Sequence, residues 1–186
     1  MKCDVLILAD LFNSGPQHWQ TLWQHKHPGW QRAPHRDWNN PACVEWVAEL
    51  DAAIATSEAG PPILVAHSLA CTLVAHWAVS GSGLAIAGAF LVAPSDVEAS
   101  SYPQDANGFA PVPMQKLPFT SIVVASANDE YVSIGRARAF AAAWGSQCVE
   151  IGKAGHVNGA SGHGAWPEGE KLLLEFCREI SNQGGR

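Results

Sequence analysis

The sequence predicts an α/β fold in which a mainly parallel sheet of about six strands carries helices on both faces. Apolar runs that are continuous rather than alternating recur along the chain, as in strands that are buried on both faces. Segments with helical spacing lie between these runs, so strand and helix alternate throughout. The length of 186 residues suffices for one hydrophobic core and is short for two, so we expect a single domain over residues 1–186.

Five apolar runs and a weaker sixth candidate are the expected strands. They lie at 4–9, 30–34 (the weaker candidate), 62–67, 86–93, 120–126 and 147–151. The expected helices lie at 16–26, 41–56, 69–79, 133–144 and 167–180. In the second helix Pro41 is expected at the first helical position. The residues expected to face the core recur at helical spacing: Val44, Val47, Leu50 and Ile54. The polar, proline-rich connection 95–118 is expected to be a surface excursion.

The composition favours a globular protein without a nucleic-acid or membrane partner. Hydrophobic residues make up 47% and charged residues 15%, which is typical of a globular enzyme or binding domain rather than a disordered chain. The net charge of -6, with only 11 scattered Lys and Arg residues, argues against a nucleic-acid partner. The first residues hold an apolar run too short for a signal peptide or a membrane span, so we expect a cytoplasmic protein without a membrane partner.

The cysteines and histidines predict neither a disulfide framework nor a metal site. Five cysteines are an odd number and show no CxxC spacing, so we expect free thiols that are mostly buried, Cys71 among them. The histidines of the first part of the chain lack the spacing of metal ligands: His18, His25, His27 and His35. No metal and no cofactor is expected.

Ser68 lies where an expected strand turns into a helix. A nucleophile elbow of the pattern GxSxG needs small residues two positions before and after its serine, because strand and helix come close together there. This chain has Ala66 and Ala70 at those positions, so a serine that only caps the helix is the simpler alternative. His67 is expected to point away from the nucleophile and to serve as a structural hydrogen-bonding residue.

An acid and a histidine follow Ser68 in the order that acyl transfer on such a sheet uses. Asp129 comes after the expected strand 120–126, and His156 lies in a glycine-rich loop after 147–151. Asp96 is an alternative acid and His163 an alternative base. An imidazole held by Asp129 is expected to have a pKa at or somewhat above about 6.5.

The rest of the site follows from the nucleophile. The backbone amides of Leu69 and Leu11 are the expected oxyanion donors, the first because it begins a helix and the second because it follows the first strand. Leu11 is also expected to floor the pocket. Aromatic residues and one histidine are the further pocket candidates: Phe12, His18, Trp19, Trp38 and Trp166. The 95–118 excursion is expected to form a rim over Ser68 with few apolar side chains: Phe109, Val112 and Met114.

With these residues in place, the chain resembles the small serine hydrolases that include the retinoblastoma-binding serine hydrolase and YdeN-like proteins. The similarity covers nearly the whole chain through NSGPQHW, VAHSLA, LVAPSD, SANDEYVS and GHVNGASGHGAWPEG. It implies a minimal three-layer α/β-hydrolase without a large lid domain, with a triad on Ser68, Asp129 and His156. Two positions depart from the family pattern. Ala70 replaces a glycine, and Ala9–Asp10 replaces a Pro-Gly pair, where an aspartate would oppose negative charge in the oxyanion hole.

The sequence therefore predicts a serine hydrolase of the carboxylesterase type that acts on a small ester, thioester or amide. The alternative is a protein-binding module on a hydrolase scaffold, since fold does not guarantee activity. No motif supports a protein partner: the nearest approach to LxCxE is SQCVE at 146–150, which lacks the leucine and falls in an expected buried strand.

Overall fold

The computed structural model describes residues 3–57, 60–103 and 105–183; the ends of the expected domain, residues 1, 2 and 184–186, lie outside the described part. Six strands form one parallel sheet in the order β2-β1-β3-β4-β5-β6. The strands are β1 (Val5–Leu8), β2 (Gln31–Arg32), β3 (Ile63–His67), β4 (Gly88–Val92), β5 (Ser121–Ala125) and β6 (Gln147–Glu150). The helices are α1 (Trp19–Lys26), α2 (Cys43–Ala55), α3 (Leu69–Val79), α4 (Ile134–Trp144) and α5 (Pro167–Gln183). The predicted α/β class and all eleven expected elements are confirmed.

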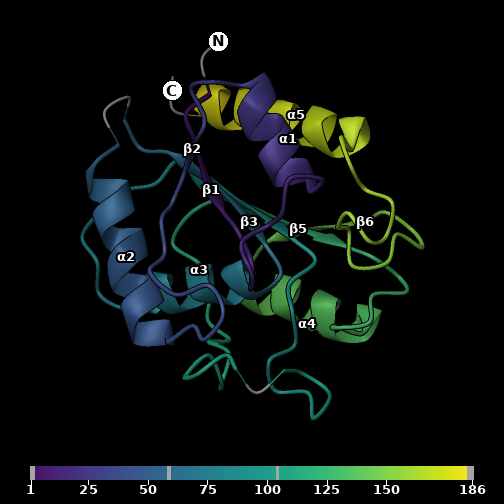
Figure 1. Ribbon diagram of the computed structural model, residues 1–186. Helices are drawn as coiled ribbons and strands as arrows, with labels where there is room; N and C mark the ends of the chain where they lie inside the picture. The colour runs from purple at the N-terminus through teal and green to yellow at the C-terminus, as the bar shows by residue number, and fades with distance from the viewer. Residues whose placement is uncertain (1–2, 58–59, 104, 184–186) are drawn as a thin grey trace.

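The helices cover both faces of the sheet and make three layers. Figure 1 shows α1 and α5 together on one face and α2, α3 and α4 on the other. Alternate residues of β1, β3, β4 and β5 supply the two cores: Leu6 and Leu8 of β1 belong to the core under α2–α4, while Val5 and Ile7 belong to the core under α1 and α5. Continuous apolar strands are the consequence, because both faces of the sheet are buried.

Two details of α2 differ from expectation. The helix begins at Cys43, so Pro41 precedes it instead of occupying the first helical position. Val44 is 78% exposed, whereas Cys43, Trp46, Leu50 and Ile54 form the buried stripe. Trp46 sets the rotation of the helix because its ring stacks at 4.0 Å on His35 and its Nε1 donates to the carbonyl of Asp37.

The expectation that residues 147–151 form a buried strand is wrong. β6 lies at the edge of the sheet and pairs with β5 alone, and Gln147, Cys148 and Glu150 are exposed. Glu150 holds Arg138 of α4 through two hydrogen bonds of 2.7 and 2.8 Å. Charged side chains on an edge strand discourage pairing with another chain.

The expectation that all the cysteines are free is also wrong. Cys3 and Cys177 form a disulfide whose Cα atoms are 6.1 Å apart, and it ties the segment before β1 to α5. The two residues are 174 positions apart, and the packing of α5 on the sheet brings them together. Cys43, Cys71 and Cys148 are free, and burial raises the pKa of the Cys71 thiol.

The 95–118 excursion is less superficial than its composition indicates. Phe109 and Val112, expected to form a rim over the nucleophile, are buried and pack in the core under α2–α4. The cavity beside Ser68 instead takes Tyr102 and Pro103 from this segment. In the described part of the chain, none of the helices has the length and apolarity to cross a bilayer.

Candidate active site

The site lies at the carboxyl edge of the sheet, where the strand order reverses. β2 flanks β1 on one side and β3 flanks it on the other, so the loops after β1 and β3 separate and leave a crevice. Ser68 follows β3 directly, and Asp10 and Leu11 lie in the loop after β1. A cavity of about 440 Å³ opens between these loops.

Ser68 sits on a strained turn between β3 and α3. Its φ of 56° and ψ of -122° lie in a region that non-glycine residues rarely adopt. Ala66 and Ala70 are both fully buried on either side of this turn, so the sheet and helix accommodate two methyl groups where the elbow pattern has glycines. The serine side chain does not cap the helix, which removes the simpler alternative for this residue.

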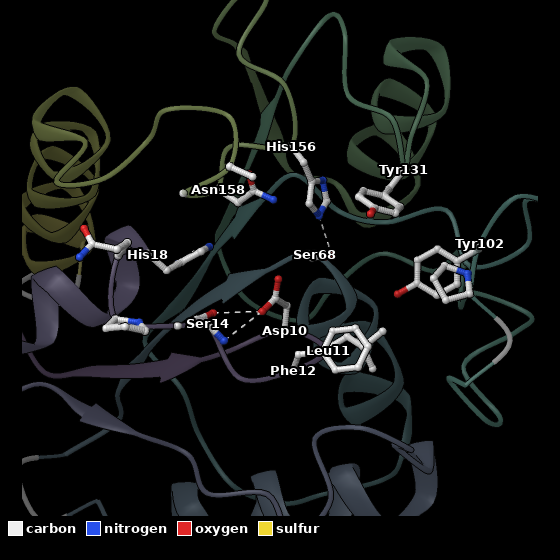
Figure 2. A pocket seen from close by; sticks show the side chains of 16 residues that line it. Asp10, Leu11, Phe12, Ser14, His18, Ser68, Tyr102, Tyr131, His156 and Asn158 are labelled. Atoms are coloured by element: carbon white, nitrogen blue, oxygen red, sulfur yellow. Dashed lines mark hydrogen bonds between the residues drawn. The ribbon is translucent and has the colours of Figure 1, made fainter.

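Three side chains from different loops form a hydrogen-bonded chain. Ser68 Oγ lies 2.9 Å from His156 Nε2, and His156 Nδ1 lies 2.9 Å from each carboxylate oxygen of Asp129 (Figure 2 shows the first contact). The Asp129 side chain is fully buried and that of His156 is 5% exposed. Since the carboxylate accepts a hydrogen bond from the Nδ1–H group, Nε2 presents a lone pair to the serine hydroxyl. This geometry can take a proton from Ser68.

Hydrogen bonds from main-chain amides to side chains hold the loop of Asp129 against the loop of His156. The amide of Ala154 donates to Ser126 Oγ at 3.0 Å, and the amide of Gly155 donates to Asn128 Oδ1 at 2.9 Å. Ser126 and Asn128 immediately follow β5, so these bonds connect the end of β5 to the segment that carries His156. These contacts, main-chain amides on one side and side-chain oxygens on the other, hold Asp129 close to His156.

The pKa of His156 differs from the expectation. Burial lowers it below 6.5, with the nearby His67 acting in the same direction, and the hydrogen bond to Asp129 only partly opposes this. The expectation of a pKa at or above about 6.5 is wrong, because desolvation of the imidazolium outweighs its carboxylate partner. The ring is thus neutral, and able to accept a proton, at neutral pH.

Two backbone amides beside Ser68 are the candidate oxyanion donors, and one of them belongs to Leu11, which lines the cavity. Leu69 is the first residue of α3, and the first amides of a helix have no partner within the helix. The amide of Leu11 makes no hydrogen bond among the described residues, although its neighbour Phe12 donates to the carbonyl of Trp38 at 2.9 Å. Phe12 and Asn13 have φ values of 67° and 60°, so the loop that presents Leu11 is itself strained.

The aspartate in this loop is paired. Asp10 Oδ2 lies 3.0 Å from His67 Nδ1, and Asp10 Oδ1 accepts a hydrogen bond of 3.2 Å from the amide of Ser14. These contacts outweigh burial and lower the pKa of Asp10 to about 2. The sequence led us to expect that Asp10 would oppose negative charge in the oxyanion hole. Its pairing with His67 offsets this effect.

The cavity has an aromatic side and a polar side. Figure 2 shows Tyr102 and Tyr131 on one side of Ser68 and His18 and Asn158 on the other. Phe12, at the mouth, is 63% exposed. Of the expected pocket residues, three line the cavity: Leu11, Phe12 and His18.

The three tryptophans expected in the pocket lie elsewhere. Trp19 is fully buried and donates from Nε1 to the carbonyl of Val157 at 2.8 Å. Trp166 packs against Trp23 in the core under α1 and α5, and Trp38 packs on the opposite face of the sheet. Large aromatic rings bury a large apolar area when they pack in a core, and this accounts for the placement of the three tryptophans.

The alternative acid and base are separate from this chain of contacts. Asp96 lies 3.3 Å from Arg136 of α4, and the ring of His163 packs at 5.9 Å on Trp166. Sequence reasoning missed Ser95, whose Oγ lies 2.7 Å from Ser68 Oγ, and Tyr131, whose ring packs edge-on at 4.5 Å against His156. The signal for Ser95 was its place just after β4, since reactive groups gather at strand ends.

The nearest approach to a metal site among the described residues is the group Asp10, His67 and His156, whose ligand atoms lie within 4.8 Å of one another. Every one of the four imidazole nitrogens already has a hydrogen-bond partner in the protein. The group therefore offers no free imidazole nitrogen to a metal ion.

Comparison with known proteins agrees with this architecture. The serine hydrolase family profile matches residues 5–175. A protein described as a YdeN-like hydrolase from Pectobacterium atrosepticum is 31% identical, covers 96% of this chain and 92% of its own, and superposes with a TM-score of 0.83. The ydeN gene product of B. subtilis is 21% identical over 94% of this chain and 98% of its own, with a TM-score of 0.74.

A more distant similarity extends to an esterase. Esterase 2 of Thermogutta terrifontis, in a butyrate-bound structure, is 17% identical over 96% of this chain and 83% of its own, with a TM-score of 0.69. At this identity the likeness shows the fold alone. No individually curated protein matches the chain.

Proposed function

Since the chain belongs to the serine hydrolase family, we propose that it is a carboxylesterase-type enzyme that hydrolyses small esters, thioesters or amides through Ser68, His156 and Asp129. The observation that carries the proposal is the continuous chain of 2.9 Å contacts from Ser68 Oγ through His156 to Asp129. We also propose that residues 1–186 fold as one domain, because both cores flank a single sheet.

This arrangement supports the following reaction. His156 Nε2 takes the Ser68 proton as Oγ attacks the substrate carbonyl carbon, and Asp129 stabilises the imidazolium that forms. The amides of Leu69 and Leu11 bind the oxyanion. Proton return from His156 to the leaving group releases the alcohol, thiol or amine and leaves an acyl-Ser68. Water, deprotonated by His156, then attacks the acyl carbon, and collapse of the intermediate releases the acid and restores the Ser68 hydroxyl.

The substrate is proposed to be small because of the walls of the cavity. At about 440 Å³ it has few apolar side chains beside Ser68, chiefly Leu11, Phe12, Tyr102 and Tyr131. Phe109 and Val112 are engaged in the core and do not extend this surface. Butyrate and propionate occupy the distantly similar Thermogutta esterase, and esters of such short acids are suitable first substrates.

Labelling by a fluorophosphonate tests the nucleophile. The intact protein should gain one phosphonyl group, located on Ser68 by peptide mass analysis, and the Ser68→Ala variant should gain none. Ser68→Ala should also lose hydrolysis of an activated ester by roughly three to six orders of magnitude while its melting temperature is kept. A folded wild-type protein that neither labels nor turns over esters would favour the alternative of a protein-binding module on a hydrolase scaffold.

A further inference from the structure

His67 lies between two groups that only accept hydrogen bonds. Its Nδ1 is 3.0 Å from Asp10 Oδ2, and its Nε2 is 2.9 Å from the backbone carbonyl oxygen of His156. The side chain is fully buried at the end of β3, one residue before the nucleophile. Water therefore does not reach the ring, and its two nitrogens have only these partners.

Counting protons on this ring gives its charge. A neutral imidazole has one N–H and one lone pair, so it can satisfy only one of the two acceptors. The remaining lone pair would face an oxygen lone pair at hydrogen-bond distance, which is repulsive. Asp10 supplies no proton, because its other oxygen accepts a hydrogen bond from the Ser14 amide and a carboxyl group is a stronger acid than an imidazolium. Both nitrogens of His67 must then carry a proton.

We propose that His67 is a buried imidazolium, paired with Asp10, that positions the backbone of His156 and helps to keep the His156 ring neutral. The proposal rests on the assignment of His156 as the base. His67 is a positioning residue: it binds the backbone carbonyl of His156, and the side chain of His156 contacts Ser68. The two rings lie 4.8 Å apart, so a fixed positive charge on one disfavours a second on the other.

The other charged or titratable groups near the two rings are consistent with this assignment. His18, the N-cap of α1, packs edge-on against His67 at 4.7 Å. Its Nδ1 accepts a hydrogen bond from the amide of Gln20, and burial lowers its pKa to about 3, so it is neutral. His156 faces Asp129 and the ring of Tyr131, and more distantly Asp10. Asp10 and Asp129 favour a charged His156, whereas His67 opposes it.

Asp10 is the residue that makes a charged histidine possible here. Burying a cation alone is costly, and a carboxylate partner with further hydrogen bonds compensates for it. The loop around Asp10 is anchored by Gln20, whose side-chain amide donates to the carbonyls of Leu8 and Val65 while its oxygen accepts from Ser14 Oγ. Ser14 in turn donates its amide to Asp10.

The direct test is ¹⁵N NMR of protein labelled at histidine. One histidine should show two protonated ring nitrogens at neutral pH, and this signal should disappear in His67→Gln. A single-proton tautomer for His67 at neutral pH would overturn the proposal. This measurement needs no turnover, so it stands even if the proposed esterase activity is absent.

The second test is the pH dependence of kcat/KM for an activated ester. His67→Gln keeps an amide donor for the His156 carbonyl but removes the charge, so the midpoint of the acidic limb should move upward by about one pH unit. The rate below that midpoint should fall by up to about tenfold, with a smaller change at pH 8. His25→Gln makes the same substitution on the surface and should leave the profile in place.

A paired variant covers the case in which Asp10, left without its partner, prevents folding. Asp10→Asn combined with His67→Gln removes both charges. It should shift the midpoint in the same direction by a smaller amount, because His67 is the nearer charge to His156 and Asp10 acts the other way. A profile that superposes on the wild type in every folded variant would refute the role in keeping His156 neutral.

Discussion

The hydroxyl oxygens of Ser68 and Ser95 lie 2.7 Å apart, and Ser95 is fully buried. If Ser68 donates its proton to His156, the Ser95 hydroxyl donates to Ser68 Oγ and fixes its rotamer. Ser95 lies just beyond β4, the strand that pairs with the one carrying Ser68. The nucleophile is thereby held in place by a residue that follows a second strand, β4.

Ser95→Ala should lower kcat modestly, by about fivefold, because a neutral hydrogen bond contributes about 1 kcal/mol. Fluorophosphonate labelling of Ser68 should still go to completion, only more slowly. Steady-state rates with a p-nitrophenyl ester measure the effect. A loss as large as that of Ser68→Ala would mean that Ser95 takes part in the chemistry itself.

The two histidine candidates separate by mutation. His156→Ala removes the group 2.9 Å from Ser68 Oγ and should lower kcat/KM by roughly three to six orders of magnitude. His163→Ala should change it by less than about tenfold, because that ring packs on Trp166 rather than on Asp129. Melting curves of both variants serve as the control for folding. The reverse order of effects would identify His163 as the base.

The pH profile should reflect a histidine with a lowered pKa. The base must be neutral to accept the serine proton, so activity is present above the pKa of His156 and is lost as the pH falls through it. Burial places that pKa below 6.5, so kcat/KM should rise with a midpoint below pH 6.5 and be level between pH 7 and 8. A midpoint at or above 6.5 would show that Asp129 outweighs desolvation.

Acyl-chain preference should follow the size of the cavity. Each methylene gains about 0.8 kcal/mol only where apolar surface covers it. With Phe109 and Val112 in the core, such surface beside Ser68 is limited. We expect the highest kcat/KM for p-nitrophenyl esters of about two to six carbons, without interfacial activation, because coverage ends there. A steady rise to twelve carbons or more would reveal an apolar channel leading away from the cavity.

The disulfide should contribute to stability. Closing a loop of 174 residues restricts the unfolded chain and stabilises the native state by up to about 5 kcal/mol in the chain-entropy description. Cys177→Ser should therefore lower the melting temperature of oxidised protein. Cys148→Ser, which removes an exposed free thiol from β6, is the matched control and should have little effect.

Reductant provides the internal check on that result. It should lower the melting temperature of the wild type to near that of Cys177→Ser and leave the variant itself unchanged. Equal melting temperatures with and without reductant would contradict a stabilising bond. Since disulfides persist mainly in oxidising compartments, the same comparison bears on the cytoplasmic location that the sequence predicts.

Local pattern alone determined much of this protein. The alternation of apolar runs and helical periodicity predicted the strands and helices of the described residues. The signal was strongest for β1, β3, β4 and β5, because burial on both faces of a parallel sheet imposes continuous apolar sequence. Since the carboxyl ends of parallel strands share one edge, it also predicted that Ser68, Asp129 and His156 would lie near one another. The order of the residues along the chain was enough for that.

Only the tertiary structure decided which side chains touch. Nothing local pairs Cys3 with Cys177, turns Trp19 and Trp166 into the core, or leaves β6 exposed at the edge of the sheet. The desolvation that lowers the pKa of His156 likewise depends on what surrounds the ring. Periodicity reports the direction in which a residue faces within its own element, whereas these contacts join segments far apart in the chain and depend on how the layers pack. The position of His67 between Asp10 and the carbonyl of His156 is such a contact, because each of the three comes from a different loop or strand end.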